Sequence, residues 1–216
     1  MIYDPTAGLG SKHVWKETIR PSRLVRILPA ALRVLRLSAA RLRHPRASFG
    51  RNVDLRCRFC LRQSQGALVS IGESCILDND LTIECRGRLI IGDRTIFGHH
   101  CTIGVLDEVI IGSDCLIAEM VSIRDHNHCF DLLDIPVRKQ GMSVATIRIG
   151  NNVWLAGKVT IAAGVTIGDN VVVGANAVVT CDLPANSVAA GVPARVIRMR
   201  SNTLPLARGD NSLCKS

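Results

Sequence analysis

The chain has 216 residues, of which 47% are hydrophobic and only 3% aromatic, and its formal net charge at pH 7 is +9. This length fits one domain, and the lack of an 18-residue apolar run argues against a membrane-spanning helix. Residues 1–66 hold 14 Lys/Arg and 3 Asp/Glu, whereas residues 67–216 hold 13 and 15, a sum of −2. The larger part of the chain is therefore not a polyanion binder.

The N-terminal part predicts a basic helical arm. Residues 1–17 lack the charged-then-apolar order of a signal peptide, so we expect a cytoplasmic protein. Residues 20–46 carry no acid and predict an amphipathic helix that contacts an anionic membrane surface. The alternative is that its apolar face packs on the rest of the protein or on another subunit. Nucleic acid is disfavoured because no aromatic platform accompanies the arginines. Those arginines form one helical stripe: Arg23, Arg26, Arg33, Arg36 and Arg43.

A six-residue repeat dominates the rest of the chain. It fits neither a helix nor an alternating strand and predicts an all-β, parallel β-helix, in which three hexads make one triangular coil. Three earlier sets of aliphatic residues, which begin at Ile71, Ile91 and Ile111, lie 20 residues apart. We expect about seven coils over residues 49–200. The regular part of the repeat has an aliphatic residue at every sixth position: Ile149, Leu155, Ile161, Ile167, Val173 and Val179.

Small residues in the repeat have a predicted place. Gly or Ala often follows the aliphatic residue, where we expect a corner that needs a positive φ or close packing. Three of the nine cysteines, Cys75, Cys101 and Cys115, fall on the small inward position four residues after it. We therefore expect free thiols in a reducing compartment. Cys57 and Cys60 form a single pair without a second one, which argues against a zinc knuckle.

The repeat is interrupted once, by an insert at residues 125–146 that contains Asp125-His126-Asn127-His128-Cys129. A long loop that leaves a regular solenoid is a candidate functional segment. A histidine there suggests a general base. The alternatives are a polar loop without a role, a metal site of His126, His128 and Cys129, and the histidine-metal site of β-helical carbonic anhydrases. His99 and His100 precede His126 by 27 and 26 residues, which does not match that last class, so we expect no metal.

Residues from about 90 to 200 resemble the hexapeptide O-acetyltransferases, which include galactoside, maltose and bacterial surface-polysaccharide acetyltransferases. Three passages carry the resemblance: residues 122–128 with Asp-His-x-His, residues 149–157 with Ile-Gly-Asn-Asn-Val-Trp-Leu-Ala-Gly, and residues 189–198 with Ala-Ala-Gly-Val-Pro-Ala-Arg-Val-Ile-Arg. The resemblance implies left-handed coils, a homotrimer, acetyl-CoA as the acyl donor and a saccharide acceptor, in surface polysaccharide or glycan biosynthesis.

The resemblance also implies residue roles. His126 matches the catalytic histidine, and the backbone N–H of Gly157 matches the donor to the oxyanion. Asp125 and His128 are both candidates to orient His126 or to touch the sugar. Further substrate contacts are implied for Asn127 and Trp154. Coenzyme A would lie in a groove between two subunits, on the backbone of Ala175 and Thr180, with its phosphates at Arg195 and Arg198. Cys181 stands where the family often has a lysine.

We therefore expect an acetyl-CoA-dependent O-acetyltransferase with an arm at residues 1–48, a β-helix at 49–200 and a flexible tail at 201–216. The alternatives are an acetyltransferase for an amino sugar or a xenobiotic, and a non-catalytic β-helical scaffold. A scaffold would need neither His126 nor the Arg195 and Arg198 pair.

Overall fold

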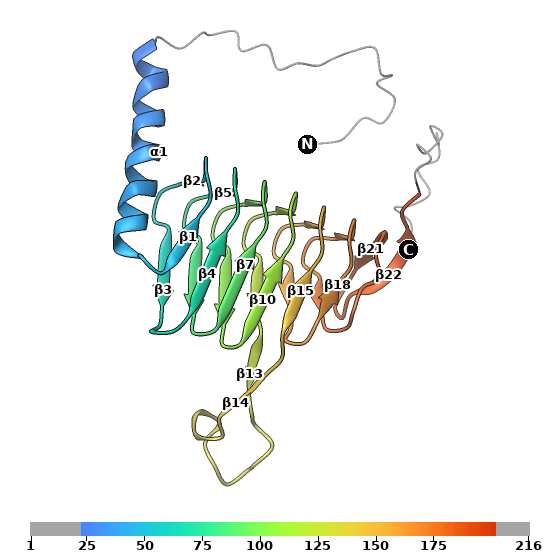
Figure 1. Cartoon of the computed structure of the whole chain (residues 1–216). Coiled ribbons are helices and arrows are strands. Elements are labelled where there is room, and N and C mark those ends of the chain that lie inside the picture. The colour runs from blue at the N-terminus through green and yellow to red at the C-terminus, as the bar shows by residue number, and fades with distance from the viewer. Residues whose placement is uncertain (1–22, 202–216) are drawn as a thin grey trace.

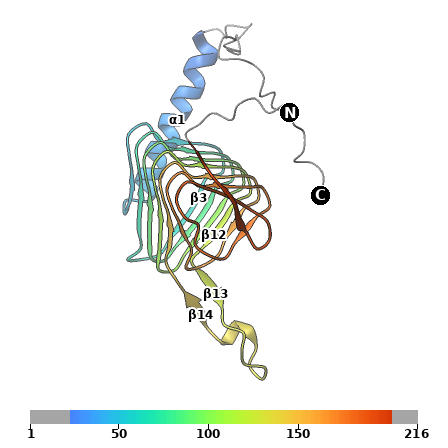
Figure 2. The same ribbon diagram turned by 90° about the vertical axis from the view of Figure 1, so that its right-hand side faces the viewer.

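The structure is a computed structural model that describes residues 23–201, with side chains from residue 31 onward. Residues 1–22 and 202–216 lie outside it, and with them the expectations about a signal peptide and a flexible tail. Three parallel sheets form the sides of a triangular prism (Figures 1 and 2). The second sheet has seven parallel strands, which confirms the expected seven coils.

The strands follow one another around the prism. The first sheet contains β1 (Ala47–Phe49), β4 (Leu68–Ile71), β7 (Arg88–Ile91), β10 (Glu108–Ile111), β15 (Ile147–Ile149) and β18 (Thr166–Ile167). The second contains β2 (Asp54–Leu55), β5 (Ile76–Leu77), β8 (Ile96–Phe97), β11 (Leu116–Ile117), β16 (Trp154–Leu155), β19 (Val172–Val173), β21 (Ser187–Ala190) and the antiparallel β22 (Arg195–Met199). The third contains β3 (Cys60–Gln63), β6 (Thr82–Cys85), β9 (Thr102–Val105), β12 (Ser122–Arg124), β17 (Thr160–Ile161) and β20 (Val178–Val179).

We name the three corners by the sheets that they join: first–second, second–third and third–first. In Figure 1 the chain rises through the first sheet at the front, crosses the top and returns behind while it advances to the right, so the coils are left-handed. The expected hand is confirmed.

Inward side chains stack in register from coil to coil. Ile71 pairs with Ile91, Ile91 with Ile111, and Ile111 with Ile149, and all four side chains are buried. No coil could bury this face alone, so the coils stabilise one another. The eight described cysteines are free. Burial raises the pKa of the Cys85 and Cys101 thiols to about 11, which makes them small apolar groups at neutral pH.

The corners differ in part from the sequence expectation. Positive φ does not occur at the glycine after the inward aliphatic residue but two residues later, as at Asn152 (φ 53°) and Asn170 (φ 60°). Asparagine tolerates this conformation, and the Asn152 amide donates to Oδ1 of Asn170 at 2.7 Å. The glycine is needed for close packing: a Cβ on Gly92 would lie 2.6 Å from the backbone of Gly112 and Ser113 in the next coil.

The helix α1 (Arg23–Arg43) covers the N-terminal end of the solenoid (Figure 1). Leu37 and Ala40 pack on the first coil, and Arg33 forms an ion pair with the buried Asp54 at 3.1 Å. Arg41 donates to the carbonyl oxygens of Phe49 and Gly50 at 3.0 and 3.1 Å. The alternative that the arm packs on the body of the protein is thus confirmed for this face. Within residues 23–201, no helix is apolar over enough of its length to cross a membrane.

The insert leaves the prism at the third–first corner as a hairpin of β13 (His126–His128) and β14 (Met142–Val144), which projects away from the coils (Figures 1 and 2). Its tip contains the 3-10 helix η1 (Val137–Lys139), and Gln140 bonds the backbone of Leu132 and Ile135. The solenoid continues past it, because β10 pairs directly with β15.

The close approach at Gly92 generates a stability prediction. Gly92→Ala should lower the free energy of unfolding by about 1–3 kcal/mol, because the new methyl group overpacks the backbone of the next coil. Ser70→Ala, on the exposed face of β4, is the control and should change it by less than about 0.5 kcal/mol. Urea unfolding of both variants measures the difference, and equal midpoints would contradict the packing role of this glycine.

Candidate active site

A hydrogen-bonded Asp–His pair lies at the base of the hairpin. Asp125 follows β12, is fully buried, and accepts from His126 Nδ1 at 2.8 Å. Its carboxylate also accepts from the backbone N–H of Leu106, at 2.9 Å to Oδ1, and of Asp107, at 2.8 Å to Oδ2. The turn after β9, one coil earlier, therefore holds the carboxylate in place. The structure assigns the orientation of His126, which the sequence left open between Asp125 and His128, to Asp125.

This arrangement determines which imidazole nitrogen can act as a base. A carboxylate has no proton to donate, and this one also accepts from two backbone N–H groups, so the hydrogen bond to Asp125 places the proton on Nδ1 of His126. The lone pair of the neutral ring is then on Nε2. The His126 side chain is 15% exposed, so the ring is mostly enclosed yet still reachable. His126 can thus take a proton from a group that approaches Nε2.

The imidazole borders a pocket of about 230 Å³ between the solenoid and the hairpin. His128, two residues along β13, lines the same pocket from an exposed position, whereas Asn127 lies between them and is exposed. The other lining residues carry both charges: Glu84, Arg86, Val105, Leu106, Arg124 and Met142. Polar side chains around a histidine suit a hydroxylated ligand, which forms several hydrogen bonds.

Sequence reasoning missed the residues that support His126. Gly104 in β9 lies against the ring, and a Cβ there would stand 3.1 Å from His126 Cε1. The backbone amides of Leu106 and Asp107 are the other supports. Gly104 replaces the charged residue that stands at the stacked positions of the neighbouring coils, Glu84 and Arg124. That break in the column is the one sequence signal that could have indicated it.

The other predicted acyl-transfer residues lie along a different edge of the prism. Trp154 in β16 is 46% exposed, and Gly157 follows it at the second–third corner. The N–H of Gly157 has no hydrogen-bond partner among the described residues. Ala175 lies one coil further along this corner, where the N–H of Asn176 bonds to the Gly157 carbonyl at 3.0 Å. Within one chain the structure does not bring His126 and Gly157 together.

The remaining predicted coenzyme contacts lie toward the C-terminal end. Thr180 follows β20 at the third–first corner, on the edge of His126 but two coils further along. Arg195 and Arg198 lie on β22, which closes this end of the second sheet. Each donates to a backbone carbonyl, at 2.9 and 3.3 Å, and neither pairs with a carboxylate among the described residues. Their charges are available to an anion.

The histidines do not form a metal site in the described part of the chain, where no group of three His, Cys, Asp or Glu side chains is placed to hold an ion. His99 and His100 lie at the second–third corner, near Asp78 and Asp80 at 3.4 and 3.6 Å. His126 lies at a different corner.

Comparisons with known proteins agree with this fold. The family model "Bacterial transferase hexapeptide (six repeats)" matches residues 146–181, and "Hexapeptide repeat of succinyl-transferase" matches residues 88–118. WbbJ of Escherichia coli, a putative lipopolysaccharide biosynthesis O-acetyl transferase, is 36% identical over 148 residues, which cover 64% of this chain and 75% of WbbJ. Galactoside O-acetyltransferase of Escherichia coli is 40% identical over 130 residues, or 60% and 63% of the two chains.

Not every relative is covered to this extent. The chain spans 45% of a probable acetyltransferase of Mycobacterium tuberculosis, which is 31% identical over 135 residues, 62% of this chain. The solved structure of AntD, an N-acyltransferase from Bacillus cereus in complex with dTDP and 3-hydroxybutyryl-CoA, has the same fold, with a TM-score of 0.64 at 20% identity over 76% and 88% of the two chains. From its coils, its repeat matches and its likeness to WbbJ, this chain belongs to the hexapeptide-repeat O-acetyltransferase family.

Proposed function

We propose that this protein transfers the acetyl group of acetyl-CoA to a hydroxyl group of a saccharide, in the synthesis of a surface polysaccharide or related glycan. The observation that carries the proposal is the buried Asp125, which holds Nδ1 of His126 at 2.8 Å beside a polar pocket. The names of WbbJ and galactoside O-acetyltransferase support a saccharide acceptor. The 3-hydroxybutyryl-CoA bound to AntD, a protein of the same fold, agrees with a coenzyme A thioester donor.

The proposed reaction needs one base and one oxyanion donor. Nε2 of His126 takes the proton of the acceptor hydroxyl while its oxygen attacks the thioester carbonyl carbon, and the carbonyl becomes a tetrahedral oxyanion. The carbon–sulfur bond then breaks, and the imidazolium returns the proton to the thiolate of coenzyme A. Asp125 stabilises the positive charge of the ring between these steps. A backbone N–H aimed at the oxyanion contributes about 3–4 kcal/mol.

The separation of His126 from Gly157 argues for an assembly. We propose a homotrimer in which the third–first corner of one subunit faces the second–third corner of the next, so that the free N–H of Gly157 meets His126 across the groove. The outer face of the second sheet supports this, because Ile96, Leu116 and Trp154 make a column of exposed apolar side chains there, at 37%, 46% and 46% exposure. A subunit interface would cover such a column.

The same groove gives coenzyme A a site. The backbone of Ala175 and of Thr180 would contact its pantetheine arm, and Arg195 and Arg198 would pair with its phosphates, since guanidinium groups bind phosphate oxygens in pairs. We propose that the enzyme works in the cytoplasm, at the inner face of the membrane, where a reducing environment keeps its cysteines as thiols. The arm would provide the membrane contact.

Loss of the base should remove activity and leave the fold intact. His126→Ala should lower the transferase rate at least about 100-fold, the contribution of a positioned base. Coenzyme A release from acetyl-CoA with a saccharide panel measures it, with sedimentation and thermal unfolding as controls for assembly and stability. A variant that kept more than a tenth of the rate would rule out His126 as the base.

Asp125 should act through His126. Asp125→Asn keeps the shape but offers an NH₂ group where an acceptor is needed, so the rate should fall about 100-fold or more. Nitrogen NMR of the imidazole should show that the ring proton moves from Nδ1 toward Nε2, while exposed His128 keeps its spectrum. Asp131→Asn, an exposed acid in the same insert, is the control. An unchanged His126 spectrum in Asp125→Asn would refute the orienting role.

The phosphate contacts predict a selective effect on the donor. Arg195→Ala and Arg198→Ala should raise the KM for acetyl-CoA more than the KM for the acceptor, because a charge-assisted hydrogen bond is worth about 1.5–3 kcal/mol. Arg94→Ala, at a corner of the mid-solenoid, is the control. If dephospho-coenzyme A and coenzyme A bound in the same ratio to wild type and both variants, contact with the 3′-phosphate would be excluded.

A further inference from the structure

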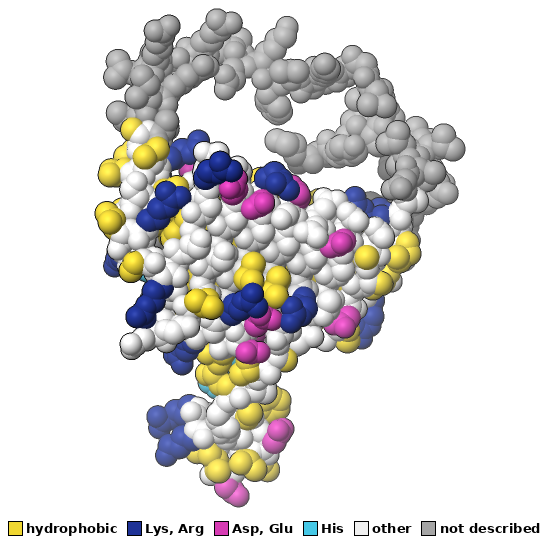
Figure 3. Space-filling view, in the orientation of Figure 1, with side chains coloured by type: hydrophobic (Ala, Val, Ile, Leu, Met, Phe, Trp, Pro, Cys, Tyr) yellow, Lys and Arg dark blue, Asp and Glu magenta, His cyan; other side chains and the backbone are white. Residues whose placement is uncertain are grey.

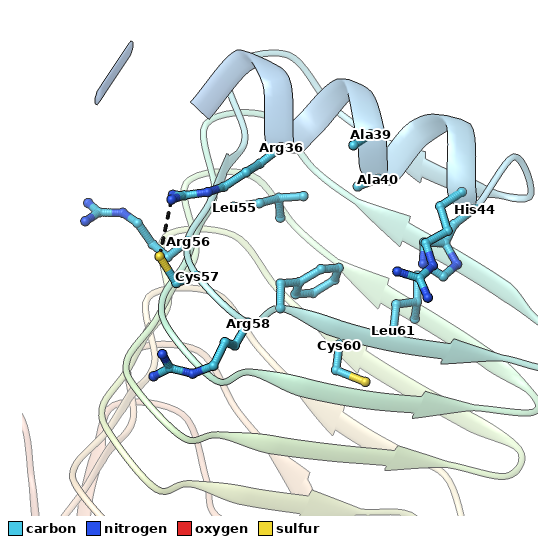
Figure 4. A pocket seen from close by; sticks show the side chains of 12 residues that line it. Arg36, Ala39, Ala40, His44, Leu55, Arg56, Cys57, Arg58, Cys60 and Leu61 are labelled. Carbon is cyan, nitrogen blue, oxygen red and sulfur yellow. Dashed lines mark hydrogen bonds between the residues drawn. The ribbon is translucent and has the colours of Figure 1, made fainter. Parts of the chain in front are cut away.

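A cavity of about 320 Å³ lies between α1 and the first coil (Figure 4), and it shares no lining residue with the pocket at His126. The helix contributes Arg36, Ala40 and Arg43, His44 follows directly after the helix, and the coil contributes basic residues on the facing side. Arg56 and Arg58 flank Cys57 there, and Phe59, which packs against the core of the solenoid, also lines the cavity. Four arginines and no acid line this cavity among the described residues.

The charge of the cavity is only partly balanced. Arg56 pairs with Asp54 at 2.9 Å, and Arg58 pairs with Asp80. Arg33 also pairs with Asp54, so five arginines lie near two carboxylates. The net charge of this group is therefore about +3.

The two helix arginines at the cavity have no acidic partner in the described chain. Arg36 donates to the Sγ atom of Cys57 at 3.2 Å, a weak acceptor. Burial and the neighbouring Arg43 lower the pKa of His44, so that this ring is neutral at pH 7 and adds no charge. Such unpaired guanidinium groups around a recess form a site for a phosphate group.

The surroundings of the cavity are apolar on two sides. Leu55 and Leu61 are buried below it. Leu35 and Leu42 of α1 are exposed at 64% and 84%, and Figure 3 shows apolar side chains along the outer side of the helix. Leu35 and Leu42 are each followed by one of the cavity arginines, Arg36 and Arg43. An apolar edge that borders unpaired cations matches the boundary between lipid chains and phosphate headgroups.

We propose that this cavity binds the phosphate of an anionic lipid headgroup while the Leu35–Leu42 edge enters the bilayer surface. This inference rests on the membrane contact in the proposed function and changes which residues make that contact. The arginine stripe does not face outward as a whole, because Arg33 and Arg36 point to the end coil. Two arginines of the stripe, Arg36 and Arg43, instead line the proposed phosphate site at the side of the helix.

Vesicle binding by the full chain, without acyl donor, tests the proposal. Wild type should bind phosphatidylcholine vesicles that contain phosphatidic acid and not those of phosphatidylcholine alone. Arg36→Gln/Arg43→Gln should weaken binding about 30-fold, the effect of two basic groups at about 1 kcal/mol each. Leu35→Ser/Leu42→Ser should weaken it also. Arg94→Gln/Arg138→Gln removes the same charge elsewhere and should bind like wild type.

Two further measurements separate the sources of phosphate. Inorganic phosphate in place of chloride, at equal ionic strength, should displace wild type from the vesicles more than it displaces Arg36→Gln/Arg43→Gln. If phosphate shifts the melting of wild type while phosphatidic acid adds nothing to vesicle binding, the lipid source is overturned. If Arg36→Gln/Arg43→Gln and Arg94→Gln/Arg138→Gln bound the vesicles equally, the site itself would be overturned. The same holds if Arg36→Gln/Arg43→Gln changed self-association and not vesicle binding.

The acetyl-transfer assay with soluble acceptor keeps the two proposals apart. The cavity variants should retain the wild-type rate with a soluble saccharide, since Arg36 and Arg43 line neither the pocket at His126 nor the proposed coenzyme site at β22. If the wild type transferred no acetyl group to a soluble saccharide, the proposed reaction would be refuted, and vesicle binding would stand as a separate result.

Discussion

Pairing between stacked coils is the interaction on which this structure depends. Every inner strand of the prism bonds its backbone to the coil before and the coil after, so each coil must keep the length and register of its neighbours. An added segment can leave only at a corner. The insert does so: the N–H of Ala145 bonds to the Asp125 carbonyl at 2.8 Å, which brings its two ends side by side. The pairing of the coils is thereby kept, and His126 lies at an edge of the prism, mostly enclosed but still reachable.

The same pairing explains why Asp125 is rigid. The backbone of the preceding coil turns at Leu106 and Asp107, and the N–H groups there point at the carboxylate rather than at a further strand. A rigid backbone therefore orients a carboxylate, which orients an imidazole. No long, flexible side chain is needed to hold the ring, because the turn of one coil fixes the carboxylate that holds the imidazole of the next coil.

The pairing also leaves an open end, which the arm covers. The first coil has no coil before it, and α1 supplies Arg41 to the free carbonyls of Phe49 and Gly50, and Leu37 and Ala40 to its apolar surface. Because a round helix lies over the end of a triangular coil, space remains at its sides. The arginine-lined cavity is one such space, so the capping of the solenoid and the proposed lipid site share a cause.

The repeat alone predicted much of this protein. Its period determined the parallel coils, their number, the inward aliphatic residues and the burial of Cys75, Cys101 and Cys115, because a residue's position within a coil follows from counting along the chain. The interruption located the histidine. Counting could not choose between positive φ and close packing at the corner glycines, because both explanations produce the same pattern. In the structure, positive φ belongs to residues such as Asn152 rather than to Gly150, and the glycine is needed for close packing.

Tertiary structure decided what depends on contacts between coils or between separate elements. The stacking of coils places Gly104 beneath the ring of His126, and it puts His126 and Gly157 on different edges. It also decides that Asp125, rather than His128, holds His126. The arm is the clearest case. Its sequence determined an amphipathic basic helix, but only the position of Asp54 and Cys57 on the first coil decided which way the arginines face, because a helical stripe has no direction until a partner surface binds one side of it.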